Sequence, residues 1–174
     1  KAKWEFITQW SLPPEDLLDL AAPNYHGIRS GEPNGPYWGR IGRSEGWEEN
    51  GQGFMNFRLD SSYIGMIPLV FAVFAFIPAL RARIRSGRSG PPIGGERIEC
   101  HVLFFSLFAL LSLLFSMGKF TPVYRLLYAL PIVGDVRAPV KFMQIFQLAL
   151  GVVSAYGLDL ALRGLPPYLE TAEF

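Results

Sequence analysis

The chain has 174 residues, of which 50% are hydrophobic, 14% aromatic and 18% charged, and its formal net charge is +1. High hydrophobicity with little net charge excludes a disordered chain, and sixteen basic residues against fifteen acidic ones provide no basic surface for nucleic acid. Cys100 is the only cysteine, so a disulfide scaffold is excluded. Because Cys100 adjoins an apolar run, we expect a buried, inert thiol.

The N-terminal region, residues 1–62, is polar and contains many aromatic residues. The segment SLPPEDLLDLAAP predicts a short helix, because Ser11 can cap its first turn and the prolines suit that turn. Asp16 and Asp19 are three residues apart and could form a metal pair, but capping and solvation on an exposed turn are the favoured interpretation. His26 follows as a lone histidine, which we interpret as structural.

Tyr37 and Trp38 lie in a stretch, residues 27–58, that shows neither helix nor strand periodicity. Aromatic faces stack on sugar rings, and they also line membrane interfaces or pack within loops. The interfacial or packed-loop interpretation is favoured here, with sugar stacking by Tyr37 and Trp38 as the alternative. The sequence contains neither a Gly-rich phosphate-binding motif nor an HExxH, GxSxG or CxxC motif.

Three uncharged apolar runs, over residues 64–80, 102–117 and 142–158, predict transmembrane helices over residues 63–80, 100–117 and 142–162. In the second run only Ser106 and Ser112 interrupt a long apolar stretch, and both can hydrogen-bond to their own helix backbone. Such a helix has no polar face to turn toward water. The sequence therefore predicts an all-α membrane protein with about three transmembrane helices.

The connections 81–99 and 118–141 and the tail 163–174 complete the predicted topology. Five arginines in 81–99 are typical of a cytoplasmic loop. Basic residues are equally frequent on the opposite side, however, so charge alone does not orient the chain. In the last predicted helix, Gly151 and Ala155 form a pair of small residues that is typical of a contact between helices.

The segment 118–141 begins with a glycine that can end the preceding helix, followed by a Thr-Pro pair that can begin another. Its apolar and aromatic residues then predict a short interfacial helix; these are Tyr124, Leu127, Tyr128 and Pro131. Arg137 and Lys141 follow, at the start of the third apolar run. An arginine fork matches phosphate oxygens, and a lysine adds a point charge. Ordinary lipid headgroups are the favoured partners of these two side chains, and a phosphorylated lipid is the more specific alternative.

Several motifs together resemble a known family. SLPPEDLL, PYWG and SSYIGMIPL are followed by GKFTPVYRLLYALP and VRAPVKF. From Trp10 to Leu162, this order resembles the bacterial YfhO family of multi-spanning membrane proteins, in which the later motifs usually read GKYTPLYRLLY-LP and FRAPxRF. The chain departs from that pattern at Val136, where an aromatic residue is usual, and at Lys141, where arginine is usual.

The resemblance implies a protein similar to GT-C glycosyltransferases, which take sugar from a polyprenyl-phosphate donor at the outer face of the bacterial cytoplasmic membrane. It implies that 1–62 and 118–141 lie outside and that 81–99 lies in the cytoplasm. The catalytic carboxylate of such enzymes lies in an earlier external loop, so no catalytic residue is assigned here. The donor phosphate would be bound by basic residues of 118–141, namely Arg137 and Lys141, with Lys119 and Arg125 as further candidates.

We therefore expect a fragment of a multi-pass inner-membrane protein that modifies cell-envelope glycans. Its partners would be membrane lipids and a polyprenyl-phosphate sugar, without nucleic acid. The sequence identifies no cofactor and no metal ligands, and a divalent metal remains open. The alternative is a non-catalytic subunit or scaffold whose helices pack against other membrane subunits, and a transporter segment is a third interpretation.

Overall fold

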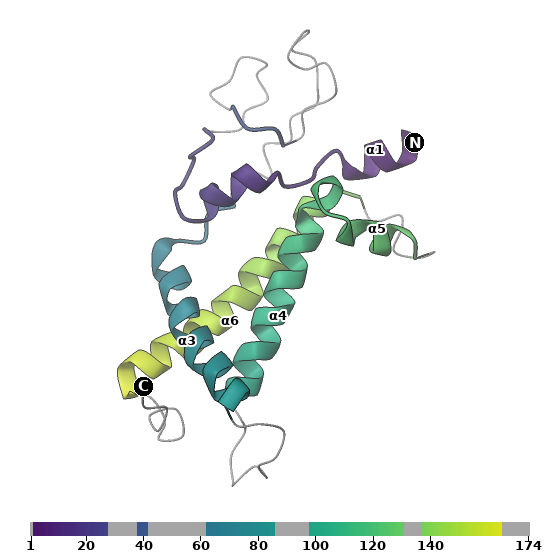
Figure 1. Cartoon of the computed structure of the whole chain (residues 1–174). Helices are drawn as coiled ribbons and strands as arrows, with labels where there is room; N and C mark the ends of the chain where they lie inside the picture. Colours follow the sequence, from purple (N-terminus) through teal and green to yellow (C-terminus); the bar gives the residue numbers. More distant parts are fainter. Residues whose placement is uncertain (1, 28–37, 42–61, 86–97, 131–136, 165–174) are drawn as a thin grey trace. The chain divides into compact units, whose positions relative to one another are not determined.

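The structure is a computed structural model that describes residues 2–27, 38–41, 62–85, 98–130 and 137–164. These residues form helices and no strand, which confirms the all-α prediction. In chain order the helices are α1 (Ala2–Thr8), the 3₁₀ helix η1 (Pro14–Leu20), α3 (Met66–Arg85), α4 (Ile98–Ser116), η3 (Gly118–Phe120), α5 (Val123–Tyr128), η5 (Pro139–Lys141) and α6 (Phe142–Arg163) (Figure 1).

Three of the described helices are long and apolar enough to cross a membrane, as predicted. The candidate spans are Met66–Ile84, Ile98–Ser116 and Pro139–Arg163. The first helix begins at Met66 and continues to Arg85, whereas residue 80 was the predicted end. Arg81 and Arg83 therefore belong to the helix and not to the following loop, because arginine has a high helix propensity and its long stem tolerates an apolar surface.

The chain divides into two compact units. Unit 1 combines Lys1–Gly65 with Leu111–Ile145, and unit 2 combines Met66–Leu110 with Phe146–Phe174. The helices α4 and α6 contribute residues to both units.

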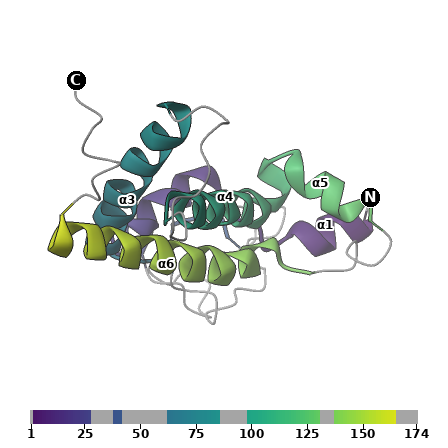
Figure 2. The ribbon, with the colours of Figure 1, turned by 90° about the horizontal axis from the view of Figure 1, so that it is seen from below.

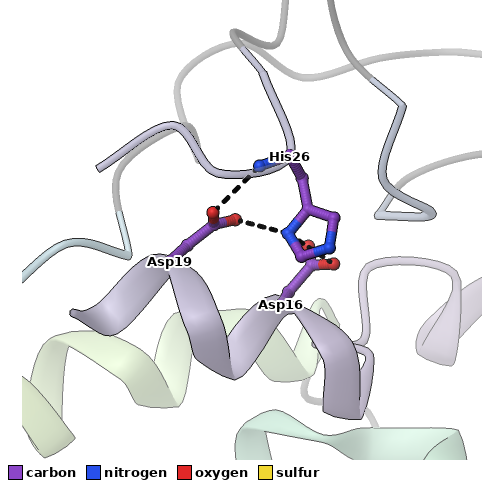
Figure 3. Close-up of side chains that lie close together, drawn as sticks. All are labelled: Asp16, Asp19 and His26. Carbon is purple, nitrogen blue, oxygen red and sulfur yellow. Dashed lines mark hydrogen bonds and ion pairs between the residues drawn. The ribbon is translucent and has the colours of Figure 1, made fainter. Parts of the chain in front are cut away.

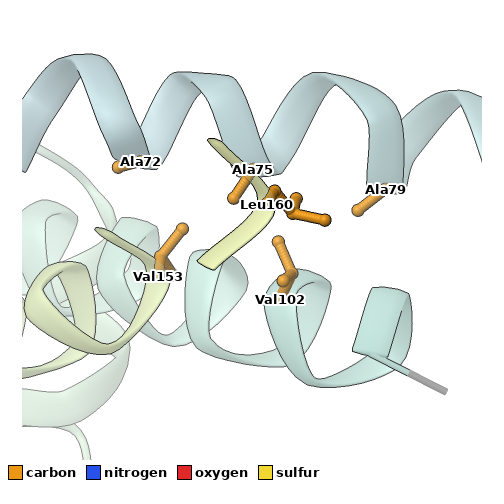
Figure 4. Close-up of a cluster of buried hydrophobic side chains, with 6 residues drawn as sticks. All are labelled: Ala72, Ala75, Ala79, Val102, Val153 and Leu160. Atoms are coloured by element: carbon orange, nitrogen blue, oxygen red, sulfur yellow. The ribbon is translucent and has the colours of Figure 1, made fainter. Parts of the chain in front are cut away.

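Small side chains form the core of unit 2. Three alanines of α3 lie on one helix face and are almost completely buried together with residues of α4 and α6; the cluster consists of Ala72, Ala75, Ala79, Val102, Val153 and Leu160 (Figure 4). Spacings of three and four residues place the alanines in one stripe. Small residues let helix backbones approach closely when lipid surrounds them, so this stripe explains why α3 packs against its neighbours.

The contact of α6 with α3 lies at Gly157 and not at Gly151 and Ala155. A Cβ atom at Gly157 would overlap the carbonyl oxygen of Phe71, whereas a Cβ at Gly151 would meet nothing within 4 Å. Gly151 and Ala155 are both exposed. Their predicted role in packing between the described helices is therefore wrong, because they lie on a different face of α6 from the residues that contact α3.

Unit 1 is joined by hydrogen bonds between its N-terminal segment and the residues that flank α4 and α6. The carbonyl of Trp10 accepts a hydrogen bond from Val140 N–H at 2.9 Å, and Leu12 N–H donates to the carbonyl of Ser116 at 2.9 Å. Ala138 N–H donates to the carbonyl of Ile7 at 3.1 Å. These backbone groups are satisfied in pairs, as buried polar groups must be.

The helix α1, which is not among the helices predicted from the sequence, packs beside α5 (Figures 1 and 2). The Trp4 ring lies 6.1 Å from the Tyr124 ring and 5.0 Å from the Tyr128 ring, measured between centroids. Tyr124 is consequently buried, whereas Leu126 of the same helix is 72% exposed. A short helix is confirmed within 118–141, and its aromatic face is covered by α1.

Two further predictions are wrong. Ser11 does not cap the following helix: η1 begins at Pro14 after an uncapped Pro13, and the Ser11 hydroxyl donates to the carbonyl of Thr8 at 2.6 Å. The N-cap position belongs to Pro13, whose side chain has no hydrogen-bonding group, so the first turn of η1 has no side-chain cap. Cys100, in the first turn of α4, is exposed rather than buried.

Candidate functional site

The four basic residues predicted to bind phosphate all belong to unit 1, and all four are exposed. Lys119 lies in η3, directly after α4, and Lys141 ends η5, directly before α6. Arg125 lies in α5, and Arg137 precedes η5 by two residues. These basic side chains thus occur where the chain leaves one candidate membrane span and enters another. We call Lys119, Arg125, Arg137 and Lys141 the basic rim.

Aromatic rings position part of the basic rim. The Arg137 guanidinium lies 4.2 Å from the centroid of the Phe6 ring, and that of Arg125 lies 6.0 Å from the Trp4 ring. Both rings belong to α1, so this helix supports both arginines. Stacking uses the flat face of a guanidinium and leaves its in-plane N–H donors available.

No member of the basic rim forms an ion pair with an acidic side chain of the described ranges. The ion pairs there involve other residues: Arg40 with Glu15, Arg163 with Asp159, and His26 with two aspartates. Arg40 is also exposed and lies over the Phe120 ring at 5.1 Å, but Glu15 neutralises it. The hydrogen bond from Arg40 lowers the pKa of Glu15 below its usual range. Within the described ranges, the positive charge of the basic rim is therefore not paired with a carboxylate.

The two aromatic residues considered for sugar stacking have different positions. Tyr37 lies outside the described residues. Trp38 is 63% exposed, and its backbone N–H donates to the carbonyl of His26 at 3.0 Å. That hydrogen bond fixes the backbone of Trp38 and leaves its indole ring accessible.

The structure also gathers three side chains that were not predicted to form a site. Asp16, Asp19 and His26 are 0%, 7% and 8% exposed. The expectation of an exposed turn at the two aspartates is therefore wrong. A 3₁₀ helix has three residues per turn, so side chains three positions apart lie one above the other. Because η1 is a 3₁₀ helix, Asp16 and Asp19 lie along one edge, and that edge faces the interior of unit 1.

A tight reversal after η1 returns His26 to the two aspartates. Asn24 adopts a left-handed backbone conformation, with φ of 56°, and its carbonyl accepts a hydrogen bond from Gly27 N–H at 2.8 Å. Asparagine tolerates this conformation better than most residues. The reversal brings the imidazole ring over η1 (Figure 3).

Asp19 holds His26 at two points. Its Oδ1 accepts a hydrogen bond from the backbone N–H of His26 at 3.1 Å, and its Oδ2 lies 3.3 Å from the ring Nδ1. Asp16 Oδ1 lies 3.8 Å from the same Nδ1. One imidazole nitrogen therefore faces two carboxylates. We call these three residues the Asp–His cluster.

The spacing of Asp16 and Asp19 was visible in the sequence, but the return of His26 was not. The available signal was the Pro-Asn turn between η1 and His26, since Pro and Asn both favour chain reversal. Comparison with protein-family models, with curated proteins and with solved structures finds no match for this chain.

Proposed function

We propose that the chain is part of an integral membrane protein of the YfhO type, similar to GT-C glycosyltransferases, that transfers sugar from a polyprenyl-phosphate donor to a cell-envelope glycan. The motif order from Trp10 to Leu162 supports this proposal, and so do the three candidate membrane spans. The bacterial cytoplasmic membrane would be its location, with 1–62 and 118–141 outside and 81–99 in the cytoplasm.

The basic rim is the observation on which this proposal depends. Its four side chains are exposed, lack acidic partners among the described residues, and occur beside the ends of α4 and α6. A lipid-linked phosphate would lie at the level of such helix ends, because its polyprenyl chain occupies the hydrocarbon layer and its phosphate occupies the headgroup layer. Charge-assisted hydrogen bonds to phosphate are among the stronger ones in proteins.

In the proposed reaction, an acceptor hydroxyl oxygen forms a bond to the anomeric carbon of the donor sugar. The bond between that carbon and the phosphate oxygen breaks, and the electron pair leaves with the polyprenyl phosphate. A carboxylate elsewhere in the protein would take the acceptor proton. Arg137 and Lys141 would stabilise the charge that develops on the leaving phosphate, which is where fixed cations accelerate a reaction most.

The decisive experiment replaces both residues in the full-length protein. R137A/K141A is expected to lower sugar transfer from a polyprenyl-phosphate donor at least about tenfold, since each hydrogen bond to a charged group contributes about 1.5–3 kcal/mol. R81A/R83A is the matched control, because it removes two exposed arginines from the C-terminal part of the candidate span Met66–Ile84. Unchanged transfer by R137A/K141A would overturn the donor-site assignment.

Ordinary lipid headgroups are the competing partners of the basic rim. Vesicles that contain either polyprenyl phosphate or phosphatidylglycerol at equal negative charge separate these partners. A specific phosphate site predicts that R137A/K141A loses affinity for polyprenyl phosphate and keeps its affinity for phosphatidylglycerol. An equal loss for both lipids would favour a nonspecific headgroup contact.

A non-catalytic membrane subunit is the second candidate function. The observation that favours it is the exposed face of α6 at Gly151 and Ala155, where a neighbouring helix could approach closely. A bulky G151L substitution should then release a partner subunit during purification in detergent, while R137A/K141A leaves that partner bound. If the chain instead belongs to a glycosyltransferase, R137A/K141A should lower sugar transfer and G151L should leave it unchanged.

A further inference from the structure

We propose that the Asp–His cluster binds a divalent transition-metal ion such as Zn²⁺ or Mn²⁺. One ligand atom from each of Asp16, Asp19 and His26 lies within 4.8 Å of the other two, and all three residues are buried. This inference goes beyond the proposed glycosyltransferase function and does not depend on it.

The distances fit a metal that enters after small side-chain rotations. Bonds of about 2.0–2.2 Å from Zn²⁺ to nitrogen and carboxylate oxygen place neighbouring donor atoms about 3–3.5 Å apart. His26 Nδ1 lies 3.3 Å from Asp19 Oδ2 and 3.8 Å from Asp16 Oδ1. A cation between these atoms would replace the contact of the imidazole with Asp19 by two metal–ligand bonds.

The charges of the cluster favour a cation. Buried carboxylates are normally paired or coordinated to metal, because desolvation of a charge is costly. Arg40 interacts electrostatically with Asp16, but the hydrogen bond of Arg40 is made to Glu15. Asp16 and Asp19 both direct a carboxylate oxygen toward the same ring nitrogen of His26, and two carboxylates that converge on one point are suited to a divalent cation. Metal binding at that nitrogen requires the neutral form of His26.

The donor set selects the class of metal. Two carboxylate oxygens would suit Mg²⁺ or Ca²⁺, but these ions prefer oxygen ligands throughout. An imidazole nitrogen is a good ligand for zinc and other first-row transition metals. Three described ligands also leave at least one coordination position for water or for an anionic oxygen, as catalytic zinc sites do.

The position of the cluster gives the metal a structural consequence as well. The metal would connect η1 to the reversal at Asn24. Because Trp38 N–H donates a hydrogen bond to the carbonyl of His26, the metal would also stabilise the segment 38–41. A ligand that binds only the folded form raises the melting temperature of the protein. Metal binding should therefore stabilise unit 1 even in a preparation that transfers no sugar.

Metal titration of the full-length protein in detergent tests this proposal. After dialysis against a chelator, we expect one equivalent of Zn²⁺ by calorimetry and one of Mn²⁺ by electron paramagnetic resonance. D16N and D19N nearly preserve side-chain shape, and together with H26Q they should each weaken binding about tenfold or more. H26C should retain Zn²⁺, because a thiolate is a good zinc ligand, and should lose Mn²⁺.

Two matched controls should keep full metal affinity. D159N removes a carboxylate of α6 that pairs with Arg163, and H101Q removes a histidine of α4 that stacks on Tyr156. At the same metal concentration, the metal should raise the melting temperature of the unsubstituted protein and of both controls more than that of D16N or D19N.

Either of two results would overturn the proposal. One is a chelator-treated, folded, unsubstituted protein that binds neither ion below about 100 µM. The other is binding of one equivalent with unchanged affinity by D16N, D19N and H26Q alike. The cluster would then be a buried hydrogen-bonded group without metal. Because every readout is binding or melting, these results are independent of the outcome for sugar transfer.

Discussion

The hydroxyl of Ser11 accepts a hydrogen bond from the backbone N–H of Lys119 at 3.1 Å, although the two residues are 108 positions apart. The same hydroxyl donates to the carbonyl of Thr8. Ser11 is 1% exposed, so both of these backbone groups depend on it. This side chain thereby connects the N-terminal segment of unit 1 to the first residue of the basic rim.

Replacement of Ser11 by alanine is expected to destabilise unit 1. The substitution removes the acceptor of the partly buried Lys119 N–H, and the loss of a typical intramolecular hydrogen bond costs about 0.5–1.5 kcal/mol. The melting temperature in detergent should fall by several degrees. The control is S106A, a partly buried serine in the middle of α4; it should have little effect, because alanine is the better helix former. Equal melting of S11A and the unsubstituted protein would contradict this account.

Gly118 is expected to tolerate no side chain. A Cβ there would overlap Ser11 Oγ and lie 2.7 Å from Pro139 Cγ, and the backbone has a φ of +49°. G118A should therefore prevent the close approach of η3 to η5 and lower the melting temperature strongly. G164A separates the two causes, because Gly164 has a φ of +82° but nothing lies within 4 Å of its Cβ position. It should show only the backbone strain, about 1–2 kcal/mol. Similar effects of the two substitutions would disprove the steric argument.

Gly157 should be essential to the packing of unit 2. An alanine there would force α6 away from the backbone of Phe71 in α3. The matched control is G151A, which lies on the same helix with open space around it. It should be neutral or stabilising by up to about 1 kcal/mol through helix propensity. Thermal unfolding of both variants in the same detergent tests this contrast, and a stable G157A protein would place the helix contact elsewhere.

The ion pair of Glu15 and Arg40 predicts a pH dependence. The hydrogen bond from Arg40 lowers the pKa of Glu15 in the folded protein. The contribution of the ion pair to stability is therefore present above the pKa of glutamate in the unfolded chain, about 4.3. It disappears as the pH falls through the lower pKa of Glu15 in the folded protein. Because both side chains are more than one third exposed, the coupling at neutral pH should be only about 0.2–1 kcal/mol.

A double-mutant cycle measures this coupling. E15Q, R40Q and the combined variant should show an interaction at pH 7 that vanishes near pH 3 and weakens in high salt. An interaction that persists unchanged at pH 3 would show that the charge of Glu15 is not its source.

The distribution of apolar residues along the chain was sufficient to predict its three long helices. Three stretches are apolar around their whole circumference, and this property depends only on the residues within each stretch. The sequence also identified the exposed basic residues of 118–141, since Lys and Arg stay near a polar surface wherever neighbours pack. The likeness to the YfhO family and the sugar chemistry that it implies stay predictions.

Only the tertiary structure decided which faces are covered. Gly151 and Gly157 lie on the same helix in similar apolar surroundings in the sequence. Of these two glycines, only Gly157 lies against the backbone of another helix. From the sequence, Asp16 and Asp19 are interpreted as solvated charges. In the structure they are aligned along a 3₁₀ helix, and the reversal at Asn24 places His26 against both. Hydrophobicity and helix propensity are local properties, whereas burial and the meeting of distant side chains depend on how separate segments pack.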